Sequence, residues 1–418
     1  MANDEGAMKA NATHSRAHES AAVSWNAFLS TYLPALIYAL GAGIALPAVP
    51  TLAKSFNVGF GVASGVITAF LLGNLAGTIP SGWLIDRFGR RSVMIAGPLL
   101  TSATALWVCY AHSFSEILVL RFFSGCAAQM WVMGRLAGIS QNAPDSQRGR
   151  LVSWMFGMDN TGKLAGPVLG GYIASEWSAT GPFFAYSGIA LVALALTLAF
   201  GEKPTGDDHG ARRERQAQAN KLTIWRIVTP RLVYFGVALF AGLTRGPVTA
   251  DLLHLYAAYA YQLGPTQIGY LATGAALIAW PIGFIAGWIL DRFGRKRTMV
   301  PGFTGVAISM ALLAASAWWG YSYPWYVALF FLAVATQSLT GGSVQTIGTD
   351  VAPQEARGVF LGIWRFTGQG GQAIGPIIFA MLAAQVNYSV AFLFTAGCAA
   401  CVATLLILMV PETRSDWS

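Results

Sequence analysis

Asp159 and Lys163 lie inside a long apolar run, where a charged side chain has a reason to do chemistry. A charge at the centre of a bilayer costs about 2.5–3.5 kcal/mol on translocon scales, so each side chain needs a partner or water. The two residues are four positions apart and would share one helix face, where they could pair with each other. Alternatively, Asp159 binds a proton or a substrate. Both interpretations stay open.

Arg121 lies in another apolar run and has no carboxylate within four residues. It must pair with an acid or a carbonyl group on another segment, or face a cavity. Arg135 lies near the end of the same run, from where its long side chain can reach the membrane surface. We therefore expect a functional role for Arg121 and none for Arg135.

Arg245, Asp251 and His254 share a third run, and Arg365 lies in a fourth. Asp251 and His254 are three positions apart, so they would share a face, and histidine can titrate near neutral pH. The apolar runs thus hold five basic residues against two acidic ones. If Arg121, Arg245 and Arg365 converged on one cavity, its potential would favour carboxylate or phosphate groups.

Aromatic and amide side chains could form the walls of such a cavity. Aromatic residues in membrane helices more often contact lipid or other helices, so each candidate is weak by itself. The candidates are Tyr32, Tyr38, Trp280, Gln337, Trp364 and Gln369.

One short charged segment occurs twice between apolar runs, at 82–91 and, 205 positions later, at 287–296. A glycine-kinked charged segment between two such runs predicts a tight loop joining two membrane helices. A carboxylate there can bond the first amides of a neighbouring helix and pair with an arginine, which would lock the two helix ends together. The alternative is a solvated loop that only fixes topology. The gating candidates are Gly82, Asp86, Arg87, Gly89, Arg90 and Arg91, and in the second copy Gly287, Asp291, Arg292, Gly294 and Arg295.

A glycine pattern also repeats, with an offset of 209 residues. Small residues four apart let two helices approach closely, and a proline can bend the helix. The predicted packing residues are Gly162, Gly166, Pro167 and Gly170, and in the second copy Gly371, Gly375 and Pro376.

The elements that carry these residues are membrane helices. Charged residues make up only 11% of the chain and apolar ones 55%, with a mean hydropathy of +0.53, whereas soluble domains carry about 25% charge. Runs of 18 or more apolar residues are long enough to cross a bilayer. We predict an all-α membrane protein of twelve transmembrane helices in two pseudo-symmetric six-helix bundles. The spans are 27–50, 60–84, 92–112, 115–138, 151–175, 181–200, 232–258, 266–290, 298–319, 323–347, 358–383 and 388–410.

The net charge of +8 does not indicate nucleic-acid binding, because its distribution follows the membrane. With a cytoplasmic N-terminus, the inner loops and tails would hold 20 of the 26 Lys and Arg residues, and the outer loops only Lys54. This is the positive-inside pattern and predicts cytoplasmic termini.

The polar stretches divide the chain around these spans. We predict a disordered cytoplasmic tail over 1–25, a six-helix bundle over 26–200 and a cytoplasmic linker over 201–230. A second bundle would follow over 231–410 and a cytoplasmic tail over 411–418.

From about 25 to 411, the chain resembles transporters of the major facilitator superfamily. The segments 82–91 and 287–296 resemble the two copies of its signature loop, and 121–125 resembles its helix-four arginine motif. Residues 162–171 and 46–50 resemble motifs of twelve-span drug:proton antiporters. The resemblance implies that the signature loop stabilises the outward-open state and that Arg121 takes part in proton coupling. It also implies that the glycine face of the fifth helix meets the eighth and limits proton leak.

We therefore expect a secondary active transporter that works by alternating access and performs proton-coupled efflux of a small molecule. Uptake or exchange of a small organic anion is the alternative, and 38–44 lacks the acidic residue that many drug antiporters carry there. A non-transporting membrane sensor or scaffold is the alternative of another class. The sequence has no phosphate-binding loop, nucleophile elbow or clustered metal ligands, so we expect no enzyme, cofactor or metal. We expect a monomer in the lipid bilayer of a bacterial inner membrane.

Overall fold

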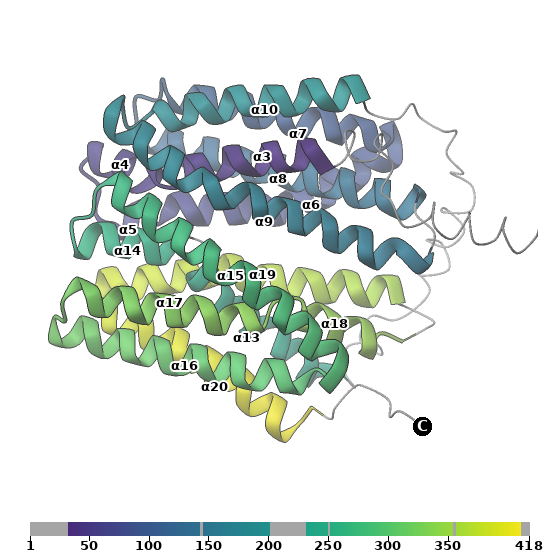
Figure 1. The fold of residues 1–418 in the computed structure, drawn as a ribbon, viewed down its shortest axis with the longest axis vertical. Helices are drawn as coiled ribbons and strands as arrows, with labels where there is room; N and C mark the ends of the chain where they lie inside the picture. The colour runs from purple at the N-terminus through teal and green to yellow at the C-terminus, as the bar shows by residue number, and fades with distance from the viewer. Residues whose placement is uncertain (1–31, 143–144, 201–230, 250, 354–356, 411–418) are drawn as a thin grey trace, which may run out of the picture.

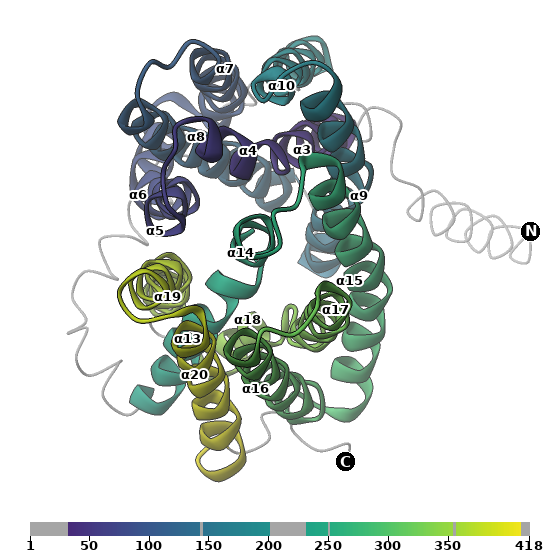
Figure 2. The ribbon, with the colours of Figure 1, turned by 90° about the vertical axis from the view of Figure 1, so that its left-hand side faces the viewer.

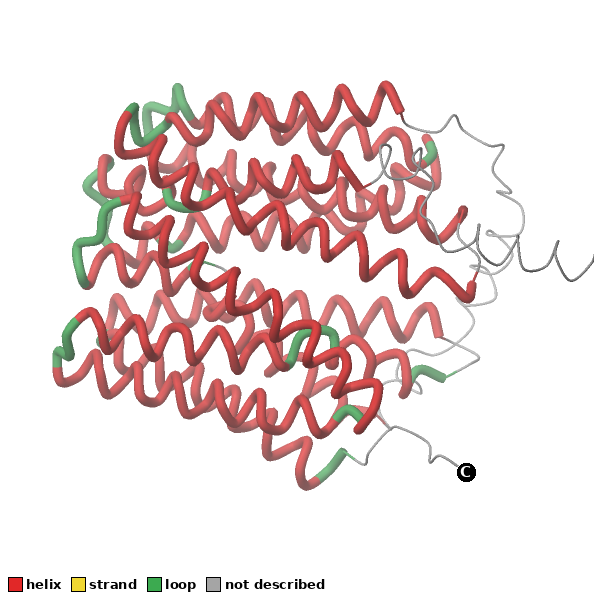
Figure 3. Tube along the Cα trace, viewed as in Figure 1, coloured by secondary structure: helices red, strands yellow, loops and turns green. Residues whose placement is uncertain are grey.

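The computed structural model describes residues 32–142, 145–200, 231–249, 251–353 and 357–410. In this part of the chain the regular elements are all helices, without a strand (Figure 3). The first half contains α3 (Leu33–Ala45), α4 (Ala48–Ser55), α5 (Phe60–Ala63), α6 (Gly65–Phe88), α7 (Arg90–Val108), α8 (Phe114–Asn142), α9 (Asp145–Glu176) and α10 (Gly181–Phe200). The second half contains α13 (Leu232–Thr249), α14 (Leu252–Ala260), α15 (Pro265–Phe293), α16 (Lys296–Trp319), α17 (Tyr323–Leu339), α18 (Ser343–Val351), α19 (Arg357–Gln385) and α20 (Tyr388–Leu408).

Each of the twelve predicted spans coincides with one helix or with two consecutive helices, which confirms the fold class. By length and hydropathy, the described residues contain nine spans that could cross a membrane. The other three predictions fall on α7, α9 and α19. The predicted tails and linker, 1–25, 201–230 and 411–418, lie outside the described residues.

Four predicted spans are each divided into two helices. Pro47 separates α3 from α4, Asp251 has a left-handed backbone (φ 63°) ahead of α14, and Gly342 (φ 79°) precedes α18. Breaks of this kind leave backbone groups without helical partners, which is tolerated at membrane depth only inside the protein or along a water-filled space. The divided spans are 27–50, 60–84, 232–258 and 323–347.

The two halves repeat the same internal packing. In Figure 1, α3 to α10 form the upper group and α13 to α20 the lower one. The first membrane helix of each half packs along the fifth, as α3 on α9 and as α13 on α19. A Cβ on Gly170 would collide with the carbonyl of Ile44, and one on Gly375 would meet the carbonyl of Leu243. Only glycine allows backbones to come this close.

The glycine face of α9 corrects one implication of the family resemblance. Gly162, Gly166 and Gly170 all lie against α3, not against α15, which is the eighth span. The contact with α15 is made further round α9, where the carbonyl of Pro167 meets Gly269. The equivalent Gly371 lies against α13.

The two halves meet tightly at one end of the bundle. At one end of the bundle, α6 and α15 end at the two charged loop segments, and we call this the motif end. The opposite end, which holds α4 and α5, is called the far end. Viewed from the far end, α14 lies between the two halves (Figure 2). At the far end Lys54 Nζ donates to the carbonyl of Ala258 (2.7 Å), and Tyr259 Oη donates to the carbonyl of Val58 (2.7 Å).

Further side chains seal the same end. The Phe60 ring packs edge-on against Tyr388 (5.0 Å between centroids), and Thr266 Oγ1 lies 2.9 Å from Ser175 Oγ. These contacts join α5 to α20 and α9 to α15. The structure is therefore closed toward the far end.

Candidate functional site

Asp159 on α9 is held by Arg135 on the preceding helix α8. Arg135 Nη1 and Nη2 donate to the two carboxylate oxygens, both at 2.9 Å. The side chains are 1% and 15% exposed, and the guanidinium lies 5.3 Å from the Trp131 ring centroid. A bidentate pair of this geometry is among the strongest interactions between side chains.

This pair corrects one sequence prediction and bears on another that was left open. Arg135 does not extend to the membrane surface but is buried, and of the two interpretations of Asp159, the pair with Lys163 is not formed. The structure shows no ion pair or hydrogen bond for Lys163 with another described residue, and its side chain is exposed. Helical spacing reveals partners on the same helix, whereas Arg135 reaches Asp159 from a neighbouring one.

Arg121 on α8 lies nearer the far end than the pair does. Its guanidinium carbon is 4.7 Å from the Phe70 ring centroid, and its buried Nε has no hydrogen-bond partner. A small cavity beside it is lined by residues that include Ser124 and Tyr186. As predicted, no acid from its own helix neutralises Arg121.

Asp251 lies at the break in the seventh span, between α13 and α14. Its carboxylate does not cap α14, and its side chain is 41% exposed. His254, one turn into α14, approaches it at 3.9 Å from Nδ1 to Oδ1, too far for a hydrogen bond. Both His254 nitrogens are buried without hydrogen-bond partners, and the ring packs on Phe330.

Three intramembrane charges come from the two halves. Arg121 and Lys163 belong to the first half, on α8 and α9, and Asp251 belongs to the second. None of the three forms an ion pair with another, and none is part of a hydrogen-bonded network in the described structure. Among the described residues, these two basic side chains and this carboxylate are therefore not paired with one another.

Arg245 and Arg365 are two further intramembrane cations, both in the second half. Arg245 on α13 is exposed and Arg365 on α19 is half-buried, and neither side chain has a hydrogen bond or ion pair with a described residue. No contact in the described structure joins either of them to Arg121, so the convergence of the three arginines stays a prediction.

Most of the proposed wall residues are packed inside a half. Tyr32 and Tyr38 are buried, and Tyr38 shares a 2.7 Å hydrogen bond with Thr101. Trp364 is 2% exposed and stacks on Phe360. These aromatic residues contribute to helix packing, as most do in membrane helices.

The other three wall candidates differ from one another. Gln337 is buried and bonds Thr340 near the end of its own helix (2.7 Å). Trp280 is 46% exposed and lies edge-on to Phe284. Gln369 is half-buried. Of the six candidates, Trp280 and Gln369 alone keep an accessible side chain among the described residues.

At the motif end, the two loop segments build the same arrangement twice. Arg87 lies over the rings of Trp83 (5.4 Å) and Phe88 (5.6 Å). Arg292 lies in the same way over Trp288 (5.5 Å) and Phe293 (5.7 Å). The glycines that follow have positive φ in both copies, 76° at Gly89 and 95° at Gly294, as predicted for a tight turn. The earlier Gly82 and Gly287 have open space where a Cβ would stand, so they are not sites of close approach.

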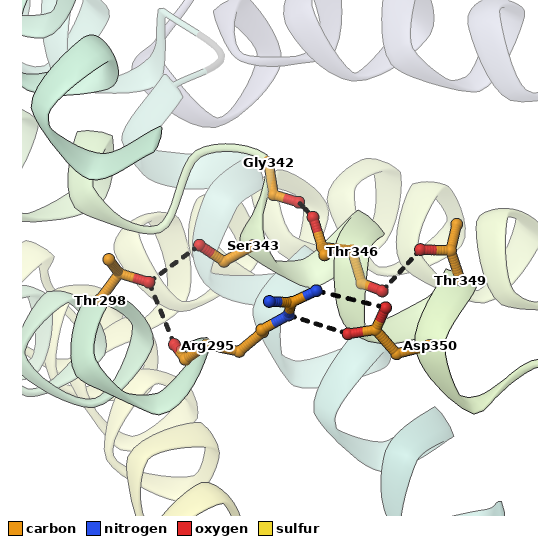
Figure 4. A network of polar contacts seen from close by, with 7 residues as sticks. All are labelled: Arg295, Thr298, Gly342, Ser343, Thr346, Thr349 and Asp350. Atoms are coloured by element: carbon orange, nitrogen blue, oxygen red, sulfur yellow. Dashed lines mark hydrogen bonds and ion pairs between the residues drawn. The ribbon is translucent and has the colours of Figure 1, made fainter. Parts of the chain in front are cut away.

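Arginines at the start of the next helix contact the helix ends beside them. Arg90 lies against Gly138 of α8. In the second half, Arg295 Nε bonds Asp350 of α18 at 2.9 Å, beside the hydroxyl pair of Thr298 and Ser343 (3.1 Å; Figure 4). The Asp350 partner was not predicted, since Asp350 lies beyond the end of a different predicted span, 323–347.

The remaining loop candidates are less defined. Asp86 and Arg91 lie at the junction of α6 and α7, where Asp86 is exposed. The side chain of Asp291 lies outside the described residues. No group of His, Cys, Asp or Glu among the described side chains could hold a metal ion.

Comparison with known proteins decides the family. The model of the Major Facilitator Superfamily matches residues 31–252 and 234–418. The chain belongs to the major facilitator superfamily. It is therefore an integral membrane transporter of small molecules and not an enzyme.

Curated relatives include drug-resistance proteins. The class B tetracycline resistance protein of Escherichia coli is 26% identical over 357 residues, which cover 83% of this chain and 86% of the relative. The quinolone resistance protein NorA of Staphylococcus aureus (strain MRSA252) is 23% identical over 251 residues, 59% of this chain and 62% of that protein.

Solved structures confirm the fold. A D-xylose-proton symporter superposes with a TM-score of 0.73 at 19% identity, over 92% of this chain and 98% of that one. A partially occluded inward-open conformation of the xylose transporter XylE from E. coli gives a TM-score of 0.70 at 18% identity, over 93% and 99% of the two chains.

Proposed function

We propose that this transporter exports a small organic molecule in exchange for protons. The observation that carries the proposal is the similarity to a tetracycline resistance protein along 83% of the chain. The intramembrane charges Arg121, Lys163 and Asp251, which are not paired with one another, support it, because intramembrane ionisable groups mark substrate and proton pathways.

The orientation follows from the charges at the two ends. The motif end carries Arg87, Arg90 and Arg292 with their basic neighbours, whereas Lys54 stands at the far end. Basic loops stay in the cytoplasm, so the motif end faces the cytoplasm of a bacterial cell and the far end faces outward. A structure closed at the far end then corresponds to an inward-facing state of alternating access. We take the working unit to be a monomer, because both halves of the transport path lie in one chain.

Proton-driven export can be tested in proteoliposomes that enclose a pH-sensitive dye. Lipophilic cations, neutral drugs and small organic acids are added in turn to vesicles holding the wild-type protein. Proton movement that depends on the protein and on a drug-like compound supports export by exchange. The proposal fails if compounds cross while the pH is unchanged under every proton gradient applied.

Uptake or exchange of an organic anion is the second candidate, and one observation favours it. Because Arg135 neutralises Asp159, the described spans keep the unpaired cations Arg121, Lys163, Arg245 and Arg365. Asp251 is then the carboxylate left to balance them. Transport of organic acids alone in the same vesicles would favour this candidate over drug export.

A further inference from the structure

We propose that a groove on the surface of the second half binds one phospholipid with a zwitterionic headgroup, and that this lipid supports the closed far end. The groove lies between α15 and α17, which pack along each other (Figure 2). Its volume is about 210 Å³, whereas one water molecule needs only about 10–15 Å³. The site does not depend on the proposed export function. The residues that line the groove are Gln267, Tyr270, Leu271, Tyr323, Val327 and Phe331.

The groove begins at the membrane surface and ends within one leaflet. Around the turn from α16 to α17, Trp319 and Trp325 are 66% and 61% exposed, and tryptophan is enriched where a membrane meets water. Tyr323 and Phe331 are eight residues apart on α17, so the groove extends about 12 Å along this helix. One leaflet of a hydrocarbon core of about 30 Å is about 15 Å thick. The groove therefore has the depth of an acyl chain in the leaflet next to the far end.

The groove is closed at its deep end and continues sideways into an apolar surface. A Cβ on Gly274 would lie 2.8 Å from the Phe331 ring, so the missing side chain lets α15 and α17 meet there. Leu277 and Phe284 follow Tyr270 at intervals of seven residues, and all three side chains are exposed. Residues at this spacing share one face of a helix. The groove is thus continuous with the face that α15 presents to the bilayer.

Hydrogen-bond donors without protein partners stand around the mouth of the groove. In the described structure the hydroxyl groups of Tyr270 and Tyr323 form no hydrogen bond. Gln267 Oε1 accepts from the Gly264 amide (3.0 Å), and its Nε2 group has no acceptor among the described residues. The ester and phosphate oxygens of a phospholipid are acceptors for these donors. None of the lining residues is charged, whereas anionic lipids are recognised by lysine and arginine, so a zwitterionic headgroup fits.

One wall of the groove also belongs to the seal of the far end. The Tyr323 ring lies 5.6 Å from the Tyr261 ring and 6.4 Å from the Tyr326 ring, measured between centroids. Tyr326 Oη donates to the carbonyl of Leu253 in α14 (2.7 Å), and α14 is the helix that lies between the two halves. A lipid that holds Tyr323 in place therefore restrains the side chains that hold α14, which supports closure.

Binding is tested by native mass spectrometry on purified protein that detergent has stripped of lipid. Phosphatidylethanolamine and phosphatidylglycerol with identical acyl chains are titrated separately. Wild type should bind one phosphatidylethanolamine at least fivefold more tightly than phosphatidylglycerol. Glycerophosphoethanolamine, which has the same headgroup without acyl chains, should not displace the bound lipid.

Two kinds of variant separate the shape of the groove from its donors. Val327→Trp fills the groove and should abolish the tight site. The double variant Tyr270→Phe with Tyr323→Phe keeps both rings, removes both hydroxyl groups and should weaken binding at least threefold. The matched controls are Val119→Trp and Tyr172→Phe, exposed residues of the first half near the far end, which should bind lipid as wild type does.

Closure is tested with spin labels on the two sides of the far end. When phosphatidylethanolamine replaces phosphatidylglycerol in vesicles, the distance distribution of wild type should shift toward shorter distances. The distribution of Val327→Trp should be the same in both lipids. The Val119→Trp control should respond as wild type does.

Each outcome decides one part of the proposal. Tight binding that survives Val327→Trp overturns the groove as the site, and a preference for phosphatidylglycerol overturns the zwitterionic ligand. Displacement by glycerophosphoethanolamine would indicate a soluble ligand and overturns the lipid. Tight binding with unchanged spin-label distances overturns the support of closure. Each variant is first shown to elute as a monodisperse protein, so that loss of folding is not mistaken for loss of binding.

Discussion

Breaking the pair between Arg135 and Asp159 should destabilise the first half strongly. Asp159→Asn leaves a guanidinium whose side chain is 1% exposed without its counter-charge. Removing one partner of a buried ion pair costs about 3–5 kcal/mol. The two bonds of 2.9 Å give a similar range of about 3–6 kcal/mol, since hydrogen bonds to charged groups contribute about 1.5–3 kcal/mol each.

Thermal unfolding in detergent provides the assay. For a unit of 150–250 residues, 1 kcal/mol corresponds to a shift in Tm of about 2–4 °C. Asp159→Asn and Arg135→Gln should therefore each lower Tm by roughly 6–20 °C. The double variant keeps two neutral amides that can bond each other, so it should recover most of this loss. The difference between singles and double gives the coupling energy of the pair.

Two results would refute this reasoning. Single variants that unfold within about 1 °C of wild type would show that the pair adds nothing to stability. A double variant that is stable yet no longer couples proton movement to transport would return Asp159 to the coupling role that the sequence suggested. Retained coupling in the double variant is the expected result.

Three further predictions follow from the packing and the two ends. Gly170→Ala should cost about 1–3 kcal/mol through overpacking against Ile44, whereas Gly188→Ala, with no atom near the added methyl group, should leave Tm unchanged or raise it. Tyr259→Phe removes the 2.7 Å bond to Val58, so the equilibrium should shift toward the outward-open state by about 0.5–1.5 kcal/mol. Distances between spin labels on the two sides of the far end would measure this shift, and unchanged distance distributions would contradict it. Asp86→Asn should lower transport per molecule while the amount of protein in the membrane stays constant; equal losses of transport and protein would indicate a purely structural loop.

The sequence predicts the membrane helices and their duplication well, because both depend on local pattern. Apolar length defines a span without reference to its neighbours, and the motif at 82–91 recurs at 287–296 with the same turn and the same arginine–aromatic contacts. The repeat within one chain therefore shows which residues of the loop recur together, without a comparison with other proteins.

Contacts between helices are predicted less well. Spacing on one helix can be read directly and allows a pair of Asp159 with Lys163, but the packing of α8 brings Arg135 to Asp159 instead. The break before α14 has a local signal in Gly246 and Pro247, which weaken a helix, yet apolar length alone makes 232–258 one span. Similarly, the burial of Trp364 depends on Phe235, which comes from a different helix.

The ion pair between α8 and α9 also constrains how the chain enters the membrane during synthesis. Arg135 and Asp159 lie on consecutive helices, and each alone would face the translocon's insertion cost of about 2.5–3.5 kcal/mol. Together they form a neutral unit whose polar atoms are mostly satisfied by each other. The helix that carries Arg135 emerges from the ribosome first, so its release into lipid is favoured only once its successor arrives. The two helices would then leave the translocon as one hairpin, and the residues that join them set how quickly the second charge reaches the first.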